Sequence, residues 1–354
     1  MTSGASSANG WSSIAWEESR ELAVPMWHKT RVPYLPSPNS LQHVDVWIPT
    51  ASSCLASSSP RHQLPASWIP PPNALWIIYV HGGAWRDPLI TSATLTPALK
   101  QLPLTDDVVL ASVSYSLSRY TQHATQPSSP ADCSRNAMHP RHILDVLAAI
   151  GFLQETAGFG SNYILAGHSC GATLAFQAAM DPARWRGGET ESASIATRIN
   201  DSDSNSNSNM SSSPHYLVQR PAMILGLNGL YDMPQLCHNP GGVYNDYRDS
   251  YEEITRGAFG DDERAWAAVS PALVEDWAAE WPEGKCVLLM QSPQDSLVPF
   301  AQAEGMRDSL RKTMGPGLRV ELVDGYGDHD DTWEKGTLLA EGISRAIKEM
   351  LPSQ

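Results

Sequence analysis

The sequence predicts an α/β fold with a mostly parallel central sheet and helices on both faces. Short apolar runs rich in β-branched residues recur along the chain, separated by stretches that can hold helices. Runs that are apolar throughout are typical of strands buried on both faces of a parallel sheet. Strands that alternate with helices form right-handed crossover units, which build open sheets of this kind. No repeat of about 20 to 50 residues is evident, so a solenoid or propeller is not expected.

Seven strands are expected along the chain. A short one at residues 44–48 precedes a Ser- and Pro-rich stretch, residues 49–72, whose composition predicts a surface loop. Helical spacing of apolar residues from Ile143 to Ile150 predicts a helix. The other six predicted strands are residues 75–80, 108–113, 163–166, 222–227, 286–290 and 318–323.

The chain is expected to contain one domain, from residue 33 to residue 354, preceded by an N-terminal segment of residues 1–32. Its 354 residues are 42% hydrophobic, which suffices for a packed core. A polar, low-complexity stretch at about residues 187–215 contains a run of serines alternating with asparagine or aspartate. We expect this stretch to be a disordered insertion within a loop.

Composition also limits the classes of partner. Lys and Arg number 24 and Asp and Glu number 38, so the net charge of −14 repels phosphate backbones and anionic lipid surfaces. Neither nucleic acid nor a membrane is expected as a partner. No apolar run approaches the ~18 to 20 residues that a bilayer requires, and no secretion signal is evident, so we expect a cytoplasmic protein. Scattered cysteines and histidines without ligand spacing predict no disulfide framework, metal or cofactor.

A pentapeptide after the predicted strand 163–166 carries the clearest chemical signal. It reads Gly167-His168-Ser169-Cys170-Gly171 and is followed by a helix-compatible run. A nucleophilic serine on a tight strand-to-helix turn requires small residues two positions before and after it, because the backbone there passes close to neighbouring elements. A surface turn with an inert serine is the alternative, since glycines also flank a serine by chance.

A second motif, His81-Gly82-Gly83-Ala84-Trp85, follows the predicted strand 75–80 directly. Glycines there allow main-chain N–H groups to point into a cleft. In serine hydrolases of this architecture that loop, together with the residue after the nucleophile, donates hydrogen bonds to the oxyanion. Gly82, Gly83 and Cys170 are therefore the candidates for an oxyanion hole, and His81 is expected to orient the loop. A turn whose glycines serve only backbone geometry is the alternative.

A serine nucleophile also requires a base and an acid that orients the base, in the chain order serine, acid, histidine. Asp295 lies in a turn just beyond the strand 286–290, and His329 lies in the loop after the strand 318–323. Catalytic groups of α/β sheets gather at these carboxyl ends. Asp232 and Asp324 are competing acids, but Asp295 is preferred because it precedes the histidine by one strand.

These motifs resemble those of the kynurenine formamidase (arylformamidase) family of α/β hydrolases, particularly the fungal type. The string from His81 to Trp85 matches the family's HGGxW signature, and Arg86-Asp87-Pro88 extends the match. The resemblance runs from about residue 33 to the C-terminus and implies the α/β-hydrolase fold. It implies hydrolysis of N-formyl-L-kynurenine, the small-molecule partner, in tryptophan catabolism and NAD biosynthesis. It implies Ser169 as nucleophile, His329 as base and Asp295 as orienting acid.

Other functions stay open at this stage. A general carboxylesterase or deacetylase shares every catalytic element and differs only in its pocket. A non-catalytic small-molecule binder is disfavoured, because such proteins commonly lose a catalytic residue and this chain keeps all three. The partners of the substrate's amino-acid end are also open, with Arg86, Asn228 and Tyr231 as candidates, and so is a homodimer. Trp85 is expected to keep the acyl side of the pocket small.

Overall fold

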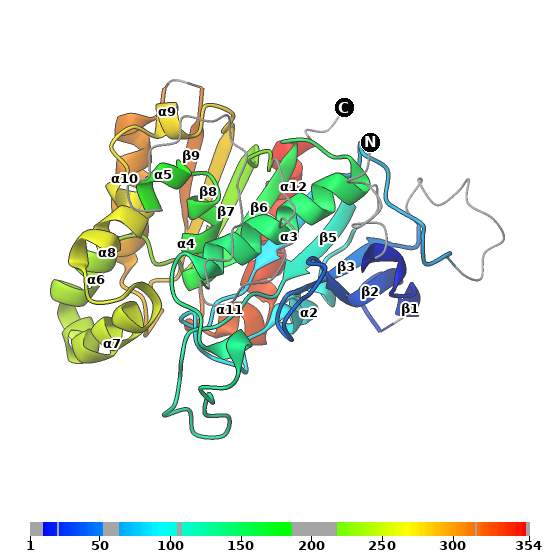
Figure 1. Ribbon diagram of the computed structural model, residues 1–354. Coiled ribbons are helices and arrows are strands. Elements are labelled where there is room, and N and C mark those ends of the chain that lie inside the picture. Colours follow the sequence, from blue (N-terminus) through cyan, green and yellow to red (C-terminus); the bar gives the residue numbers. More distant parts are fainter. Residues whose placement is uncertain are drawn as a thin grey trace.

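Nine strands pair into one sheet in the computed structural model, which describes residues 10–19, 21–51, 64–104, 108–185, 218–315 and 317–351 (Figure 1). The strand order is β1-β2-β3-β5-β4-β6-β7-β8-β9. The predicted insertion at residues 187–215 and much of the predicted loop at 49–72 lie outside the described residues. The strands are β1 (Glu17–Ser19), β2 (Met26–Pro33), β3 (His43–Pro49), β4 (Leu75–Val80), β5 (Val108–Val113), β6 (Tyr163–His168), β7 (Met223–Leu227), β8 (Cys286–Gln291) and β9 (Arg319–Asp324).

The predicted fold class is confirmed. Strands β4 to β9 pair in parallel, whereas β1, β2 and β3 add an antiparallel extension on the β5 side. All seven predicted strands are present, and their ends agree within two residues. The strands β1 and β2 were not predicted; in β2, charged and polar residues interrupt the apolar alternation on which such predictions depend.

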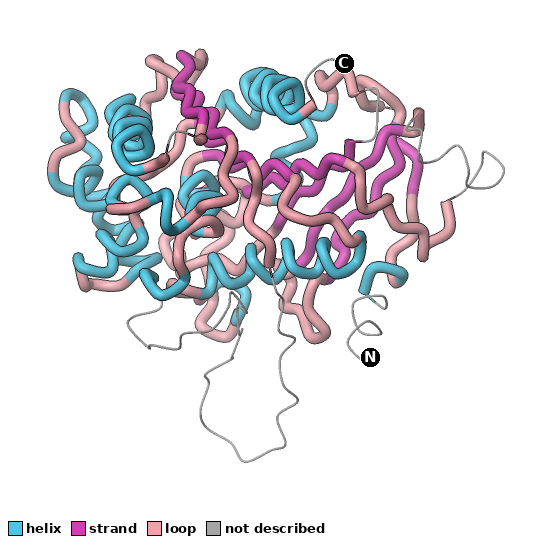
Figure 2. The backbone as a smooth tube through the Cα atoms, turned by 90° about the horizontal axis from the view of Figure 1, so that it is seen from above, coloured by secondary structure: helices cyan, strands magenta, loops and turns pink. Residues whose placement is uncertain are grey.

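Helices cover both faces of the sheet, as Figure 2 shows. The α-helices of at least six residues are α3 (Arg141–Ala157), α4 (Cys170–Gln177), α6 (Met233–His238), α7 (Arg248–Phe259), α8 (Glu263–Val269), α10 (Phe300–Thr313) and α12 (Thr337–Met350). The remaining helical elements, which are the 3-10 helices and the α-helices of four residues, are η2 (Ser92–Leu95), α2 (Thr96–Leu99), η3 (Cys133–Arg135), α5 (Pro182–Trp185), η4 (Gly242–Tyr247), η5 (Pro271–Leu273), α9 (Trp277–Glu280) and α11 (Asp331–Glu334).

The central strand β4 explains why the strands are apolar throughout. Its Trp76 and Ile78 pack into one core with α3, α4 and α10, whereas Ile77 and Tyr79 pack into a second core with α2 and α12. Successive side chains of a strand point to opposite faces, so a strand covered on both sides has no polar face. The two cores hold the sheet rigidly, and its carboxyl-terminal edge can therefore position side chains accurately.

A buried lysine fastens the N-terminal segment to the sheet. The Nζ of Lys29, on β2, donates hydrogen bonds to the carbonyl oxygens of Trp11, Ile14 and Ala66 at 2.8, 2.6 and 2.7 Å. It also lies 4.9 and 5.1 Å from the ring centroids of Trp11 and Trp16. Three carbonyls and two aromatic faces replace the water around the ammonium. The segment before residue 33, which we expected to precede the domain, thus contributes strands to the sheet.

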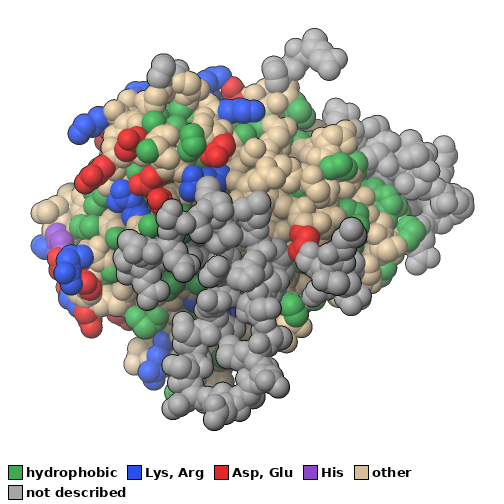
Figure 3. Space-filling model, turned by 45° about the horizontal axis from the view of Figure 1, so that its top comes forward, with side chains coloured by type: hydrophobic (Ala, Val, Ile, Leu, Met, Phe, Trp, Pro, Cys, Tyr) green, Lys and Arg blue, Asp and Glu red, His purple; other side chains and the backbone are tan. Residues whose placement is uncertain are grey.

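The described surface carries charges of both signs. On the face seen in Figure 3, acidic and basic side chains are interspersed on the part of the surface that the structure describes. Among the described residues, no helix is both long and apolar enough to cross a bilayer.

Three histidines are buried around the carboxyl-terminal edge of the sheet. Burial lowers the pKa of His81 to about 4 and that of His142 to about 3, and it holds the pKa of His168 well below its usual value. His142 shares a hydrogen bond of 2.9 Å with the hydroxyl of Ser118, and His81 stacks on Tyr115 at 4.4 Å between ring centroids. The folded protein therefore holds all three imidazoles neutral at neutral pH.

These histidines should make the fold sensitive to acid. In the unfolded chain they bind protons near pH 6.5, whereas in the folded protein they do so only at much lower pH, so the unfolded state takes up more protons as the pH falls. The free energy of unfolding should fall below pH 6.5 by about 1.4 kcal/mol per pH unit for each histidine. Urea denaturation at pH 7.5, 6 and 5 measures this slope. In the His142→Gln variant the free energy of unfolding should depend less steeply on pH, by the contribution of up to one proton. An unchanged slope would contradict the conclusion that the folded protein holds His142 neutral.

Candidate active site

Strand β6 and helix α4 meet in a sharp turn at Ser169. Its backbone has φ 56° and ψ −126°, a strained conformation for a residue other than glycine. The Ser169 N–H donates to the Leu227 carbonyl on β7 at 3.0 Å, which holds the turn against the sheet. A Cβ at Gly167 would overlap the carbonyl of Gly171, and one at Gly171 would overlap the carbonyl of Val80. The predicted strand–turn–helix geometry and its need for both glycines are thus observed.

The loop after β4 lies directly beside this turn. Strands β4 and β6 are parallel neighbours, with Val80 opposite Gly167, so their carboxyl ends leave the sheet together. A Cβ at Gly82 would lie 2.9 Å from His168 Nδ1 and 3.0 Å from Ser169 Cβ. The main chain of the glycine loop therefore touches the serine turn, and no side chain separates them.

The glycine loop has an unusual backbone. Gly83, Ala84 and Trp85 all have positive φ, at 95°, 51° and 57°. The left-handed conformation costs a residue other than glycine about 1–2 kcal/mol, so two of the three positions are strained. The Trp85 N–H donates to the Sγ of Cys170 at 3.2 Å, and the Cys170 thiol thereby holds the loop against α4.

Two further groups hold the glycine loop from the other side. The Tyr115 hydroxyl donates to the carbonyl of His81 at 3.0 Å, with the carbonyl of Gly82 at 3.3 Å, and lies 3.6 Å from Cys170 Sγ. His81 Nδ1 lies 2.9 Å from the Gly82 carbonyl oxygen. The orienting role of His81 stays a prediction, whereas the contribution of Tyr115 was not foreseen.

Asp295 and His329 form a buried pair. His329 Nδ1 lies 2.8 Å from Asp295 Oδ2, and neither side chain is more than 6% exposed. The other oxygen, Oδ1, accepts hydrogen bonds from the N–H groups of Leu297 and Val298 at 2.9 and 2.8 Å. These donors stabilise the carboxylate without water, and the carboxylate in turn fixes the orientation of the imidazole.

The two competing acids serve other purposes. Asp232 caps helix α6 by accepting the N–H of Gln235, and Asp324 is exposed at the end of β9. Of the three candidate acids, Asp295 is the one in contact with His329.

The histidine within the serine turn has a positioning role that the sequence did not reveal. His168 Nε2 donates a 3.1 Å hydrogen bond to the carbonyl of His329, and the two rings lie 4.7 Å apart. Burial, together with the nearby His329, keeps the pKa of His168 well below its usual value, so the donor stays neutral. Asp328 adds a second connection, since its Oδ1 accepts the N–H groups of Ser296 and His329 at 2.8 and 2.7 Å. The loops that carry the acid and the histidine are thereby joined.

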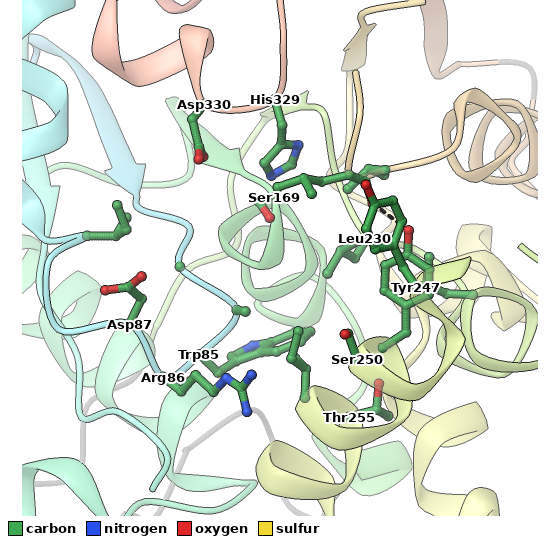
Figure 4. Close-up of a pocket in the computed structure, with 18 of the residues that line it drawn as sticks. Trp85, Arg86, Asp87, Ser169, Leu230, Tyr247, Ser250, Thr255, His329 and Asp330 are labelled. Atoms are coloured by element: carbon green, nitrogen blue, oxygen red, sulfur yellow. Dashed lines mark hydrogen bonds between the residues drawn. The ribbon is translucent and has the colours of Figure 1, made fainter. Parts of the chain in front are cut away.

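Ser169 and His329 line one cavity of about 340 Å³. Figure 4 shows the ring of His329 pointing toward Ser169. No hydrogen bond joins the two side chains in this structure, although both are described; such bonds are often long before substrate binds. The described lining residues are Gly83, Ala84, Trp85, Arg86, Asp87, Ile90, Tyr120, Ser169, Leu230, Leu236, Tyr247, Ser250, Tyr251, Ile254, Thr255, Leu297, Val298, His329 and Asp330.

One wall of the cavity comes from η4 and α7. Figure 4 shows Tyr247, Ser250 and Thr255 on this wall. Two tyrosines attach the wall to the loop that carries the acid: Tyr244 donates to the carbonyl of Asp295 at 2.6 Å, and Tyr251 donates to that of Leu297 at 2.8 Å. The wall of the cavity and the position of the acid are therefore coupled.

The three polar residues considered as partners of the substrate's amino-acid end differ in whether they line the cavity. The amide of Asn228 bridges the Thr332 hydroxyl and the Ser292 N–H, and it is fully buried. Tyr231 is buried and packs edge-on against the ring of Phe176. Neither residue lines the cavity, whereas Arg86 does.

The arrangement is suited to acyl transfer through a serine. It combines a strained serine that lines the cavity, a buried histidine–carboxylate pair and a neighbouring loop of main-chain N–H groups. Of the three predicted oxyanion donors, Gly83 lines the cavity, whereas Gly82 and Cys170 lie next to Ser169 but do not line it. Within the described ranges, no cluster of three or more His, Cys, Asp or Glu side chains could hold a metal ion.

Comparison with known proteins finds relatives over nearly the whole chain. The kynurenine formamidase avaC of Aspergillus versicolor is 32% identical over 330 residues, covering 88% of this chain and 96% of that protein. The kynurenine formamidase-like hydrolase fscH of Fusarium equiseti is 32% identical over 339 residues, covering 90% and 94%. A kynurenine formamidase of Meyerozyma guilliermondii is 28% identical over 262 residues, covering 74% and 80%. No family model matches the chain.

Solved structures share the fold at low sequence identity. A truncated carbohydrate esterase from gut microbiota superposes with a TM-score of 0.57 at 17% identity, covering 95% of this chain and 99% of that one. Esterase B from Lactobacillus rhamnosis gives 0.55 at 13% identity, covering 96% and 84%. These likenesses establish the α/β-hydrolase fold.

The packing of the serine turn predicts a sharp contrast between two glycines. Gly171→Ala should destabilise the protein by at least about 2 kcal/mol, because its methyl group would overlap the backbone carbonyl of Val80, which cannot rotate away. Gly305, inside α10, has open space where a Cβ would lie, so Gly305→Ala should stabilise by about 0.5–1 kcal/mol through helix propensity. Chemical denaturation measures both; equal effects would refute the packing argument.

Proposed function

The chain belongs to the kynurenine formamidase family of α/β hydrolases, and we propose that it hydrolyses N-formyl-L-kynurenine to L-kynurenine and formate, a step of tryptophan catabolism that leads toward NAD. The observation that supports this most directly is the Asp295–His329 pair, which faces the Ser169 turn across one cavity. The cytoplasm is the proposed location.

In the proposed mechanism Ser169 is the nucleophile and His329 is the general base. The Ser169 Oγ attacks the formyl carbon while His329 Nε2 accepts its proton. Asp295 holds the other ring proton at Nδ1, which leaves Nε2 free to act as the base and stabilises the imidazolium that forms.

The oxyanion of the tetrahedral intermediate is proposed to accept hydrogen bonds from N–H groups of Gly82, Gly83 and Cys170. The contacts of Cys170 Sγ and Tyr115 fix this loop before the reaction, so little reorganisation is needed as charge develops. His329 then protonates the departing aryl amine. Water, activated by the same histidine, hydrolyses the formyl-serine and releases formate.

The walls next to the serine suit a small acyl group. Trp85 lines the cavity, is fully buried and packs edge-on against Phe259 with 4.9 Å between ring centroids. A large ring held in this way cannot move aside for a bulky acyl chain. A general carboxylesterase is the second candidate, and the esterase-like fold favours it as much as a formamidase.

Steady-state kinetics separate these two functions. N-formyl-L-kynurenine should be hydrolysed with kcat/KM of ~10⁴ M⁻¹s⁻¹ or more, ahead of p-nitrophenyl acetate and butyrate. The Ser169→Ala variant should lose about 10³-fold or more on every substrate that the wild type hydrolyses, because the nucleophile is gone. Turnover of the esters alone would replace the formamidase with a general esterase.

The orienting acid is tested by Asp295→Asn. The two backbone donors, Leu297 and Val298, should bind the amide oxygen, so that the amide NH₂ faces His329 and forces the proton onto Nε2. A ring in that tautomer cannot accept the serine proton, so kcat should fall by about 10³- to 10⁴-fold with little change in KM.

Asp232→Asn is the matched control. Both residue types cap helices well, so kcat and stability should stay within about twofold and 0.5 kcal/mol of the wild type. If Asp295→Asn kept its kcat, Asp295 would not be the orienting acid.

A further inference from the structure

The cavity beside Ser169 has one strongly cationic side chain among its described lining residues, Arg86. It directly follows the glycine loop and Trp85. The remaining polar lining groups are hydroxyls, the indole N–H of Trp85, the carboxylates of Asp87 and Asp330, and His329. A ligand that carries an anionic group into this cavity has a guanidinium to bind.

The side chain of Arg86 is held in place, but its guanidinium keeps hydrogen-bond donors that no described residue occupies. Its side chain is 13% exposed, its Nη1 donates to Glu253 Oε1 at 2.9 Å, and its guanidinium stacks on the ring of Tyr120 at 4.1 Å. A guanidinium offers five N–H donors in its plane, and stacking covers only the face. Within the described residues, Glu253 is its sole hydrogen-bonding partner, so most of the donor edge is available.

A second donor lies at the adjacent position. The Nε1 of Trp85 is buried and has no hydrogen-bond partner among the described residues, and the residue lines the same cavity. A buried N–H without an acceptor is costly, and a bound acceptor would remove that cost. Figure 4 shows Trp85 and Arg86 on the lower side of the view, with Ser169 between them and His329.

We propose that Arg86 binds the α-carboxylate of the substrate's amino-acid end while the formyl group lies at Ser169; this inference rests on the proposed function. N-formyl-L-kynurenine carries its formamide on one ring carbon and, on the neighbouring ring carbon, a ketone side chain that ends in the amino-acid carboxylate. The edge of a guanidinium matches a carboxylate with two parallel hydrogen bonds. One short stretch of chain, residues 82–86, then fixes both ends of the substrate, because the oxyanion donors and the carboxylate receptor follow each other directly.

The ion pair with Glu253 suggests another role, in which Arg86 serves only to tie α7 to the glycine loop. The two roles differ in what Glu253 does. If the ion pair only joins α7 to the glycine loop, Glu253 is as important as Arg86. If Arg86 binds the substrate's carboxylate, Glu253 competes with the substrate for the guanidinium. Glu253 is 60% exposed at the rim, so a carboxylate that replaces it returns it to water at little cost.

The test compares two substrates that differ by the carboxylate alone, N-formyl-L-kynurenine and N-formylkynuramine. Arg86→Met should lower kcat/KM for N-formyl-L-kynurenine about ten- to hundredfold, mainly through KM, and should leave N-formylkynuramine within twofold. Glu253→Gln should keep or increase kcat/KM for N-formyl-L-kynurenine.

Arg256→Met is the matched control, because Arg256 likewise pairs with a glutamate and stacks on an aromatic ring, yet it lies on α7 and does not line the cavity. It should leave both substrates unchanged. The proposal would be overturned if Arg86→Met lowered kcat/KM equally for both substrates and Glu253→Gln did the same. Arg86 would then serve only to join α7 to the glycine loop. Wild-type enzyme that does not distinguish the two substrates would also overturn it while leaving the formamidase intact. Hydrolysis of neither formamide would overturn both.

Discussion

The close approach of helix α4 to the ends of β4 and β6 is the constraint on which the site depends. At Gly167 and Gly171 the main chain of one element touches the main chain of the next, with no space for a methyl group. This contact bends the chain sharply at Ser169 and brings the glycine loop against the turn. Because β4 and β6 are parallel neighbours, groups far apart in the sequence emerge at the same edge of the sheet.

Around this contact, hydrogen bonds hold each proposed catalytic group from a distant part of the chain. Cys170 and Tyr115 hold the strained glycine loop, and His168 holds the loop of His329. Tyr244, from the cavity wall, holds the loop of Asp295. The strain at Ser169 and in the glycine loop persists because these contacts, and the two cores beneath them, leave the backbone no relaxed alternative.

The sequence predicted those features that depend on residues close together in the chain. Strands β4 to β8 are buried on both faces and almost entirely apolar, which made them predictable, and a serine between spaced glycines predicted the turn. Asp295 and His329 were predicted from chain order, and their contact is observed. Tyr115, Tyr244 and the bond from His168 to the His329 carbonyl depend on partners distant in sequence, for which no local pattern exists. The same is true of Lys29, whose three carbonyl acceptors lie in two separate segments.

The cavity wall is built from a continuous segment between β7 and β8, whereas Ser169, Asp295 and His329 come from the ends of separate strands. Substitutions during evolution can therefore change the cavity wall and these three residues separately. Substitutions on the inner side of η4 and α7 can change which molecules enter the cavity and leave the proposed catalytic residues unchanged. Tyr244 and Tyr251 are the exceptions, because their hydroxyls also hold the loop that carries Asp295. A lineage can diversify its substrates through this segment as long as those two side chains are retained.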